Sequence, residues 1–151
     1  MSAALCCAVT CAGIVLLSGP AHGKADPKPQ SQLTEQLTRA IATVRTGGSS
    51  KNRTDAAERI AELTRKINAK EIDDGIIADL VSRLDTSDDP VRYWVARCLG
   101  NLGPRARVAI PKLQRLLAEV DCLQGSKTSA SGIRFALTQM GVTPSPTKCA
   151  P

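Results

Sequence analysis

Few side chains in this sequence of 151 residues could support catalysis. Its one histidine, His22, lies near the N-terminus, and histidine is the residue most often used as a general acid or base near neutral pH. The sequence has no Ser-His or Cys-His arrangement, no glycine-rich phosphate loop with its lysine, and no set of zinc ligands. We therefore expect a protein that is not an enzyme and that needs no metal and no cofactor.

Acidic side chains form the densest group of candidate ligands. The run lacks the order of acids and glycine of an EF-hand, so we expect helix capping or exposure to solvent, with a weak calcium site as the alternative. Two of the acids stand next to Arg92, and we expect this turn to cap a helix and to bond neighbouring segments. The acids are Glu71, Asp73, Asp74, Asp79, Asp85, Asp88 and Asp89.

Arginine and tyrosine side chains form the candidate partner-binding group, because both residue types are enriched at the energetically important positions of interfaces. Adjacent residues on a helix point about 100° apart. We therefore expect Trp94 in the core and Tyr93 at the surface. Replacing two of the arginines by alanine is expected to weaken partner capture with little loss of stability. The group comprises Arg92, Tyr93, Arg97, Arg105 and Arg107, and the two arginines are Arg92 and Arg105.

The N-terminus has the pattern of a secretory signal peptide over residues 1–23. Residues 3–17 are apolar and uncharged, a helix-breaking Ser-Gly-Pro follows, and small residues precede a cleavage position near Gly23 or Ala25. The apolar run is too short for a membrane span, so the mature chain is expected to be periplasmic or secreted without a transmembrane segment. Cleavage would also remove His22. A buried N-terminal helix is the alternative.

Three cysteines would remain in an exported chain, where disulfides persist. Cys98 lies on an apolar helical stripe, which predicts a buried free thiol. Cys122 and Cys149 lie in loop or tail sequence, and we expect a disulfide between them that ties the C-terminus to the domain. Three free thiols are the alternative.

Apolar patterns of helical period fill most of the chain. The sequence has only three aromatic residues and no sustained period of two, which favours packed helices over a sheet. A polar linker with two prolines over 24–31 precedes a domain over 32–141, and an irregular tail follows over 142–151. Helices are expected over 32–45, 54–68, 72–84, 90–102, 104–120 and 129–140.

The six expected helices group as three pairs. Leu63, Leu102 and Met140 occupy like positions, 39 and 38 residues apart, which is a spacing typical of helical repeat proteins. Each pair alone would leave one face uncovered, whereas three stacked pairs bury a continuous aliphatic core. The pattern predicts an all-α fold, a short right-handed α-solenoid of about three helical hairpins.

The stretch over 80–120 resembles a HEAT or HEAT-like repeat of the phycobilisome-lyase type. The flanks over 32–68 and 129–141 fit only by periodicity, since neither has the complete turn motif. The resemblance implies a protein-binding scaffold and brings no catalytic residues. The matching residues are Asp88, Asp89, Pro90, Val91, Arg92, Ala96, Leu99, Gly100, Leu102, Gly103, Ile110, Pro111, Leu113, Leu116 and Leu117.

Charge is unevenly distributed along the chain. The net charge is +6, with +4 over residues 35–70, −6 over 71–89 and +7 over 92–151. A basic surface favours acidic partners at modest ionic strength. Nucleic acid is not an expected partner, because stacking aromatics and a reading motif are absent from the sequence.

These observations predict an exported, non-catalytic protein–protein interaction module with an unknown protein partner. One alternative is a lyase-like or enzyme-accessory protein that holds a ligand or client protein in the solenoid groove. The other is a cationic protein that makes weak contact with an anionic envelope surface. A polar-lined pocket of several hundred cubic ångströms would favour the ligand-holding function. A flat groove with exposed Arg and Tyr would favour the interaction module, and steep loss of binding with salt would favour the surface binder.

Overall fold

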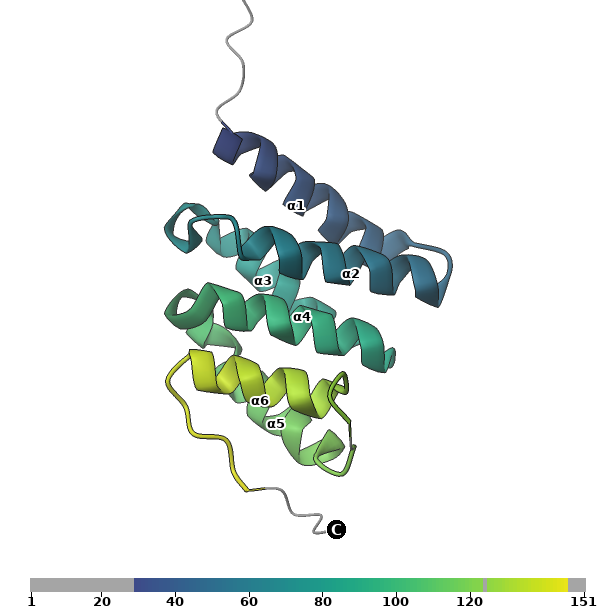
Figure 1. Cartoon of the computed structure of the whole chain (residues 1–151), viewed down its shortest axis with the longest axis vertical. Helices are drawn as coiled ribbons and strands as arrows, with labels where there is room; N and C mark the ends of the chain where they lie inside the picture. The colour runs from purple at the N-terminus through teal and green to yellow at the C-terminus, as the bar shows by residue number, and fades with distance from the viewer. Residues whose placement is uncertain (1–28, 124, 147–151) are drawn as a thin grey trace, which may run out of the picture.

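The fold is shown in Figure 1, a computed structural model that describes residues 29–123 and 125–146. Within these residues the chain is all-α, as predicted, and contains no β-strand. The elements in order are α1 (Pro29–Thr46), α2 (Ser50–Thr64), the 3₁₀ helix η1 (Ala69–Glu71), α3 (Asp74–Arg83), α4 (Asp89–Leu102), the 3₁₀ helix η2 (Gly103–Ala109), α5 (Ile110–Val120) and α6 (Ser129–Gln139).

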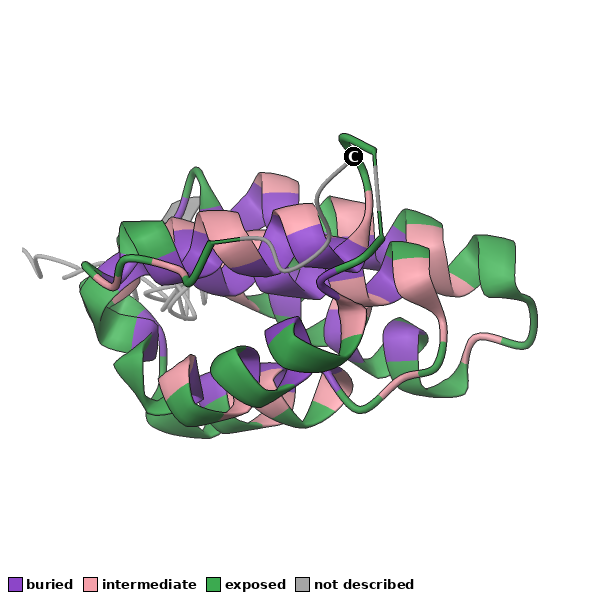
Figure 2. Cartoon of the chain, turned by 90° about the horizontal axis from the view of Figure 1, so that it is seen from below, coloured by how far each residue is buried: buried purple, intermediate pink, exposed green. Residues whose placement is uncertain are grey.

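Helices α2, α4 and α6 lie side by side in one layer, with α4 in contact with both neighbours (Figure 1). Helices α3 and α5 lie behind this layer, and α1 packs along α2 at one end of the stack. Seen from below, the buried residues lie on the inner sides of the helices and the exposed residues on the outer sides (Figure 2). The helices thus form three consecutive pairs. Their assignment to a right-handed, HEAT-like solenoid stays a prediction.

The first two helices begin earlier than predicted. Helix α1 begins at Pro29, so the last residues of the predicted linker are helical. Proline is well suited to a first helical position, where its missing N–H leaves no bond unmade. Helix α2 begins at Ser50 instead of Thr54, because the Ser49 side chain accepts a hydrogen bond from the N–H of Asn52 and caps the helix.

The next boundaries follow local chemistry more closely. Helix α3 begins at Asp74 because the Asp73 carboxylate accepts a 2.6 Å hydrogen bond from the N–H of Gly75. Helix α4 begins at the predicted Asp-Pro turn and ends at Gly103, whose φ of +54° suits a residue without a Cβ. Residues 142–146 have no regular secondary structure, in agreement with the predicted irregular tail.

The segment predicted as one helix over 104–120 is divided in two. Residues Gly103–Ala109 form η2, which contains non-helical backbone at Ala106, and α5 begins at Ile110. Pro111 lies in the first turn of α5. Proline lacks an N–H and its ring clashes with the carbonyl group four residues earlier, so a continuous α-helix through this position is unfavourable.

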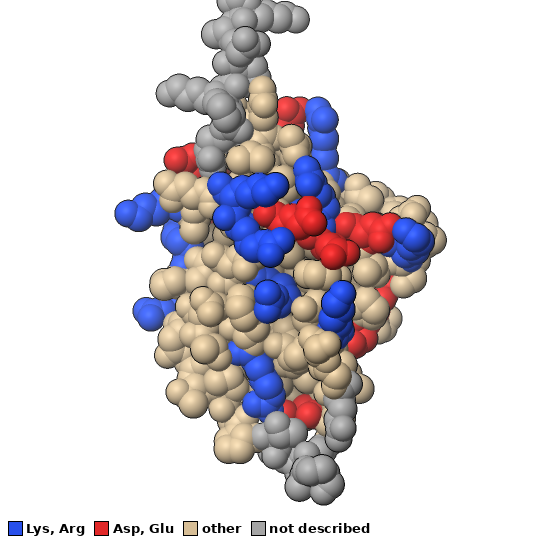
Figure 3. Space-filling view, in the orientation of Figure 1, with Lys and Arg blue, Asp and Glu red and all other residues tan. Residues whose placement is uncertain are grey.

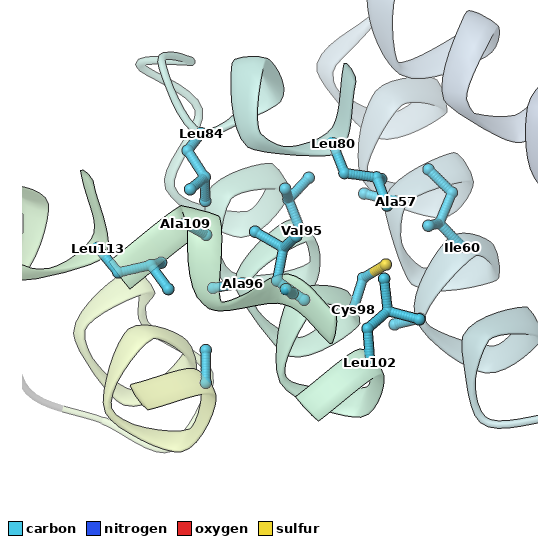
Figure 4. Packing of buried hydrophobic residues seen from close by; sticks show 14 of the residues in the cluster. Ala57, Ile60, Leu80, Leu84, Val95, Ala96, Cys98, Leu102, Ala109 and Leu113 are labelled. Atoms are coloured by element: carbon cyan, nitrogen blue, oxygen red, sulfur yellow. The ribbon is translucent and has the colours of Figure 1, made fainter. Parts of the chain in front are cut away.

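One hydrophobic cluster runs through the described residues from Leu37 in α1 to Met140 after α6. The predicted like positions Leu63, Leu102 and Met140 are all buried in it. Because the cluster is continuous, each helix pair covers the apolar side of its neighbour. Figure 4 shows side chains from four helical segments directed into this interior, including Ile60, Leu80, Leu84, Val95, Cys98 and Leu113.

Two glycines allow α4 and α6 to approach each other closely. A Cβ atom on Gly132 would lie 2.7 Å from the carbonyl oxygen of Tyr93. A Cβ atom on Gly100 would lie 2.6 Å from the ring of Phe135. Both distances are too short for a side chain, so the packing of these helices requires glycine at both positions. The contact thus places Tyr93 of α4 against α6, and Phe135 of α6 against α4.

Candidate functional site

The arginines predicted to bind a partner do not converge on one patch, and Arg92 has a structural role. Its Nε donates a 3.1 Å hydrogen bond to the carbonyl oxygen of Leu84, and its Nη2 donates to the carbonyl oxygen of Thr86. These carbonyls belong to the turn between α3 and α4. These bonds disagree with the expectation that alanine at both Arg92 and Arg105 barely changes stability, because two partly buried carbonyls would lose their donor.

Arg105 and Arg107 likewise bond backbone carbonyls at the ends of helices. Arg105 Nη2 donates 2.8 Å hydrogen bonds to the carbonyl oxygen of Ile72 and the carboxylate of Asp74. Arg107 Nε donates a 3.2 Å hydrogen bond to the carbonyl oxygen of Met140, which follows α6. The last carbonyls of a helix have no partner inside the helix, so these guanidinium groups of η2 supply one from outside it.

The predicted positions of Tyr93 and Trp94 are reversed in the structure. Tyr93 is buried, with 8% of its surface exposed, and packs against Gly132 of α6, whereas Trp94 is only partly buried. The prediction assumed that only one apolar stripe of α4 is buried. However, α4 is covered by α2, α3 and α6, so its buried arc is wider than one stripe and includes Tyr93. The rings of Tyr93 and Trp94 pack edge to face, with their centroids 4.8 Å apart.

A positively charged side chain lies over one aromatic ring of α4 and over one aromatic ring of α6. The Arg97 guanidinium lies 3.7 Å from the centroid of the Phe135 ring, and the Lys127 ammonium lies 5.9 Å from the centroid of the Trp94 ring. Lys127 is exposed and the other three side chains are partly buried. We name this surface the cation–aromatic face, defined by Trp94, Arg97, Lys127 and Phe135.

The electrostatic surroundings of the cation–aromatic face favour a negatively charged partner. Figure 3 shows the layer of α2, α4 and α6 from outside, with acidic and basic side chains intermingled over α2 and mainly basic side chains amid uncharged surface over α4 and α6. The residues over 92–146 carry eight basic and two acidic side chains. An aromatic ring beside a cation offers both apolar area and charge.

Sequence reasoning found only Arg97 of this face. Trp94 and Arg97 are three residues apart on α4, a spacing that places them on one side of a helix and was available from the sequence. Phe135 and Lys127 come from α6 and the loop before it. Their approach to α4 depends on the packing of α6, for which the sequence had no local signal.

The acidic pair at the start of α4 bonds the two neighbouring helices. Asp88 accepts hydrogen bonds from the Ser50 hydroxyl at 2.7 Å and from Arg53 Nη2 at 3.0 Å, both at the start of α2. Asp89 accepts 3.2 Å hydrogen bonds from the N–H of Ser129 and a further one from its hydroxyl. The predicted bonding between segments is confirmed. Asp88 is the N-cap residue of α4, as the turn predicted, but its side chain makes no capping hydrogen bond within α4.

The remaining acids also have structural partners. Asp73 caps α3, Asp79 pairs with Arg83, and Asp85 pairs with Lys112 at 2.6 Å. Over the part of the chain that the structure describes, no group of three or more His, Cys, Asp and Glu side chains could hold a metal ion. In the same residues, no helix combines the length and apolar character that a membrane crossing requires.

The described cysteines occupy two different environments. Cys98 is a free thiol and fully buried, which confirms its predicted state. Burial raises the pKa of the Cys98 thiol to about 12, although a hydrogen bond with Thr64 acts in the opposite direction. Cys122 is disulfide-bonded. Its predicted partner Cys149 lies outside the described residues, as do His22 and the predicted signal peptide over 1–23.

The structure has a groove between α3 and η2 and another between α4, α5 and the turn after α3. The first, which we name the apolar groove, has a volume of about 410 Å³. The second, the polar groove, has a volume of about 340 Å³. The apolar groove is lined by Asp74, Ile77, Ala78, Val81, Arg105 and Val108, and the polar groove by Asp85, Arg92, Lys112, Arg115, Leu116 and Glu119.

No family model, no curated protein and no solved structure matches this chain. The geometry of the cation–aromatic face and of the two grooves therefore carries the functional argument.

Proposed function

We propose that this protein is an exported, non-catalytic interaction module of HEAT-like repeats that binds an acidic segment of a partner protein. The apolar run over 3–17 and the small residues near Gly23 support export. Three stacked helix pairs with one shared core support the repeat scaffold.

The observation that most strongly supports binding of an acidic partner is the cation–aromatic face. Arg97 and Lys127 stand over partly exposed rings, in a region where few acidic side chains oppose them. Burial of such a ring beneath a partner removes apolar surface from water. The same contact places a carboxylate of the partner beside a cation. The face thus combines the two residue types that most often dominate binding energy.

The test is capture of partner proteins from the native envelope or secreted fraction by the immobilised full chain. Arg97→Glu combined with Lys127→Glu reverses both charges of the face. Because the partner is expected to be acidic, capture should weaken about tenfold or more. Quantitative mass spectrometry of the captured proteins measures the loss.

The matched control is Arg45→Glu combined with Lys66→Glu, which makes the same change in net charge at exposed positions of the α1–α2 pair. This control should retain capture. Equal loss in both double variants would show that net charge alone attracts the partner, and unchanged capture by the first variant would exclude the cation–aromatic face.

The polar groove favours a second candidate function, the holding of a charged ligand or client. Its lining includes Arg92, Lys112 and Arg115 together with two carboxylates, and its volume of about 340 Å³ meets the size expected of a ligand site. Native mass spectrometry of the purified chain would detect a bound small molecule. Arg115→Ala should reduce its occupancy, whereas occupancy that is the same in this variant would exclude the groove.

The cationic surface binder stays a third candidate because of the net charge of +6. Sedimentation with vesicles of anionic phospholipid tests it. Binding by this mechanism should fall steeply with salt and depend on total charge, so both charge-reversal double variants should lose it equally.

A further inference from the structure

The apolar groove lies between α3 and η2. Helix α3 lies behind the layer of α2, α4 and α6 that carries the cation–aromatic face (Figure 1). Val108 of η2 lies at the edge of the groove with 70% of its surface exposed, the largest exposed fraction of any large hydrophobic side chain among the described residues. The adjoining surface of α3 consists of small apolar side chains, Ala78 and Val81, above the buried Ile77. A projecting apolar group thus stands directly beside a hollow that could receive a similar group.

Charges of opposite sign flank this hollow. Asp74 on the α3 side and Arg105 on the η2 side are 2.8 Å apart, with 85% and 40% of their side chains exposed. These are the two charged side chains that line the apolar groove. One wall therefore carries an acid and the other a base. An exposed ion pair contributes little to stability, so either member can exchange its partner at small cost.

We propose that the apolar groove is the interface of a symmetric homodimer. In a two-fold interface the same patch meets itself, so every feature must face its complement on the other copy. Here Val108 of each copy would fill the hollow beside Ala78 and Val81 of the other copy. Asp74 of each copy would face Arg105 of the other.

A second copy fits this surface better than an unrelated partner does. A partner segment whose charges all have one sign would face a residue of the same sign on one of the two walls, and this repulsion would weaken binding. A two-fold rotation brings the acidic wall of each copy to the basic wall of the other. The net charge of +6 opposes association at long range. That repulsion is largely screened at 0.15 M ionic strength, where the Debye length is about 8 Å.

The first test is sedimentation equilibrium of the full chain over a wide concentration range, with free thiols alkylated so that no disulfide links two copies. The natural sequence should show a monomer–dimer equilibrium. Val108→Glu should weaken dimerisation about tenfold or more, because it places a charge in the apolar centre of the interface. The matched control is Leu123→Glu, which changes the other exposed large hydrophobic side chain, with 45% exposure.

A chain that stays monomeric at every concentration would overturn the proposal. So would a dimer that Val108→Glu leaves intact, or one that Leu123→Glu disrupts to the same extent. Circular dichroism of each variant shows whether the fold is retained, and Val108→Ser provides a milder variant if Val108→Glu does not fold.

The second test uses the expected exchange of charges between copies. Asp74→Arg alone and Arg105→Asp alone each place like charges opposite one another and should reduce dimerisation. A mixture of the two variants restores opposite charges at both contacts, so a heterodimer should form more strongly than either homodimer. A mixture that associates no better than its components would exclude the two-fold arrangement. This face is separate from the cation–aromatic face, so its failure leaves the proposed function intact.

Discussion

Arg92 shows how a single guanidinium group can stabilise a turn in this protein. It bonds the carbonyls of Leu84 and Thr86, and all three residues are buried or partly buried. We expect Arg92→Ala to lower the free energy of unfolding by about 1–3 kcal/mol, since two carbonyls lose a charged donor. Urea denaturation measures the change. Arg115→Ala, at an exposed position, is the control and should stay within about 0.5 kcal/mol.

Because of Cys98, the free energy of unfolding is expected to decrease at alkaline pH. Its pKa of about 12 in the folded chain exceeds the ordinary value of 9.0, so the folded state holds the thiol proton more tightly than the unfolded state does. The contribution to stability is complete below pH 9 and is lost progressively between pH 9 and pH 12. The free energy of unfolding should fall there by up to about 1.4 kcal/mol per pH unit from this group.

Chemical denaturation at several pH values tests this dependence. Cys98→Ala should show a shallower decline than the natural chain over the same range. The thiol should also resist iodoacetamide in the folded state, because thiolate is the reactive form and the side chain is fully buried. Rapid alkylation of Cys98 in the folded chain would contradict both expectations.

At the level of elements, the contact between α4 and α6 depends on glycine. Alanine is a better helix former than glycine by about 1 kcal/mol, so Gly132→Ala would stabilise an isolated helix. In the folded chain its Cβ would lie 2.7 Å from the Tyr93 carbonyl oxygen, and the helices would have to separate. We expect a net loss of about 1–3 kcal/mol, measured by thermal or urea unfolding.

Gly48→Ala is the matched control for this prediction. No atom lies within 4 Å of a Cβ at Gly48, and the residue has no positive φ. The free energy of unfolding of the Gly48→Ala variant should therefore differ from that of the natural chain by less than about 0.5 kcal/mol. A Gly132→Ala variant as stable as the natural chain would show that α6 can shift away from α4 without loss of packing.

At the level of the whole molecule, the continuous core predicts cooperative unfolding. The cluster joins α1 to α6, so no helix pair has a separate core. Far-ultraviolet circular dichroism reports on all helices, and fluorescence of Trp94, the one tryptophan, reports on the packing around α4. The two signals should give the same denaturation midpoint. Loss of helix before the change in Trp94 fluorescence would instead show separate unfolding of the N-terminal pair.

Local chemistry made α4 the best predicted element. Its Asp-Pro start, its apolar spacing and its stop at Gly103 are all properties of neighbouring residues. The same local rules failed between Gly103 and Pro111, where η2 replaces the first turns of the predicted helix. The position of a proline was visible in the sequence. The choice between a short first turn and a complete 3₁₀ segment depends on how Ala106 and Ala109 pack in the core.

The sequence by itself determined that the described chain is helical, where most helices end, and that Cys98 and the like positions Leu63, Leu102 and Met140 are buried. These properties follow from the helical period and from capping, which act over a few residues. Only the tertiary structure decided which side chains remain at the surface. Tyr93 is buried because Gly132 leaves space for it on α6. Arg97 lies over the Phe135 ring because α4 and α6 pack against each other. Such contacts join residues about 40 positions apart, and no local pattern encodes the distance between two helices.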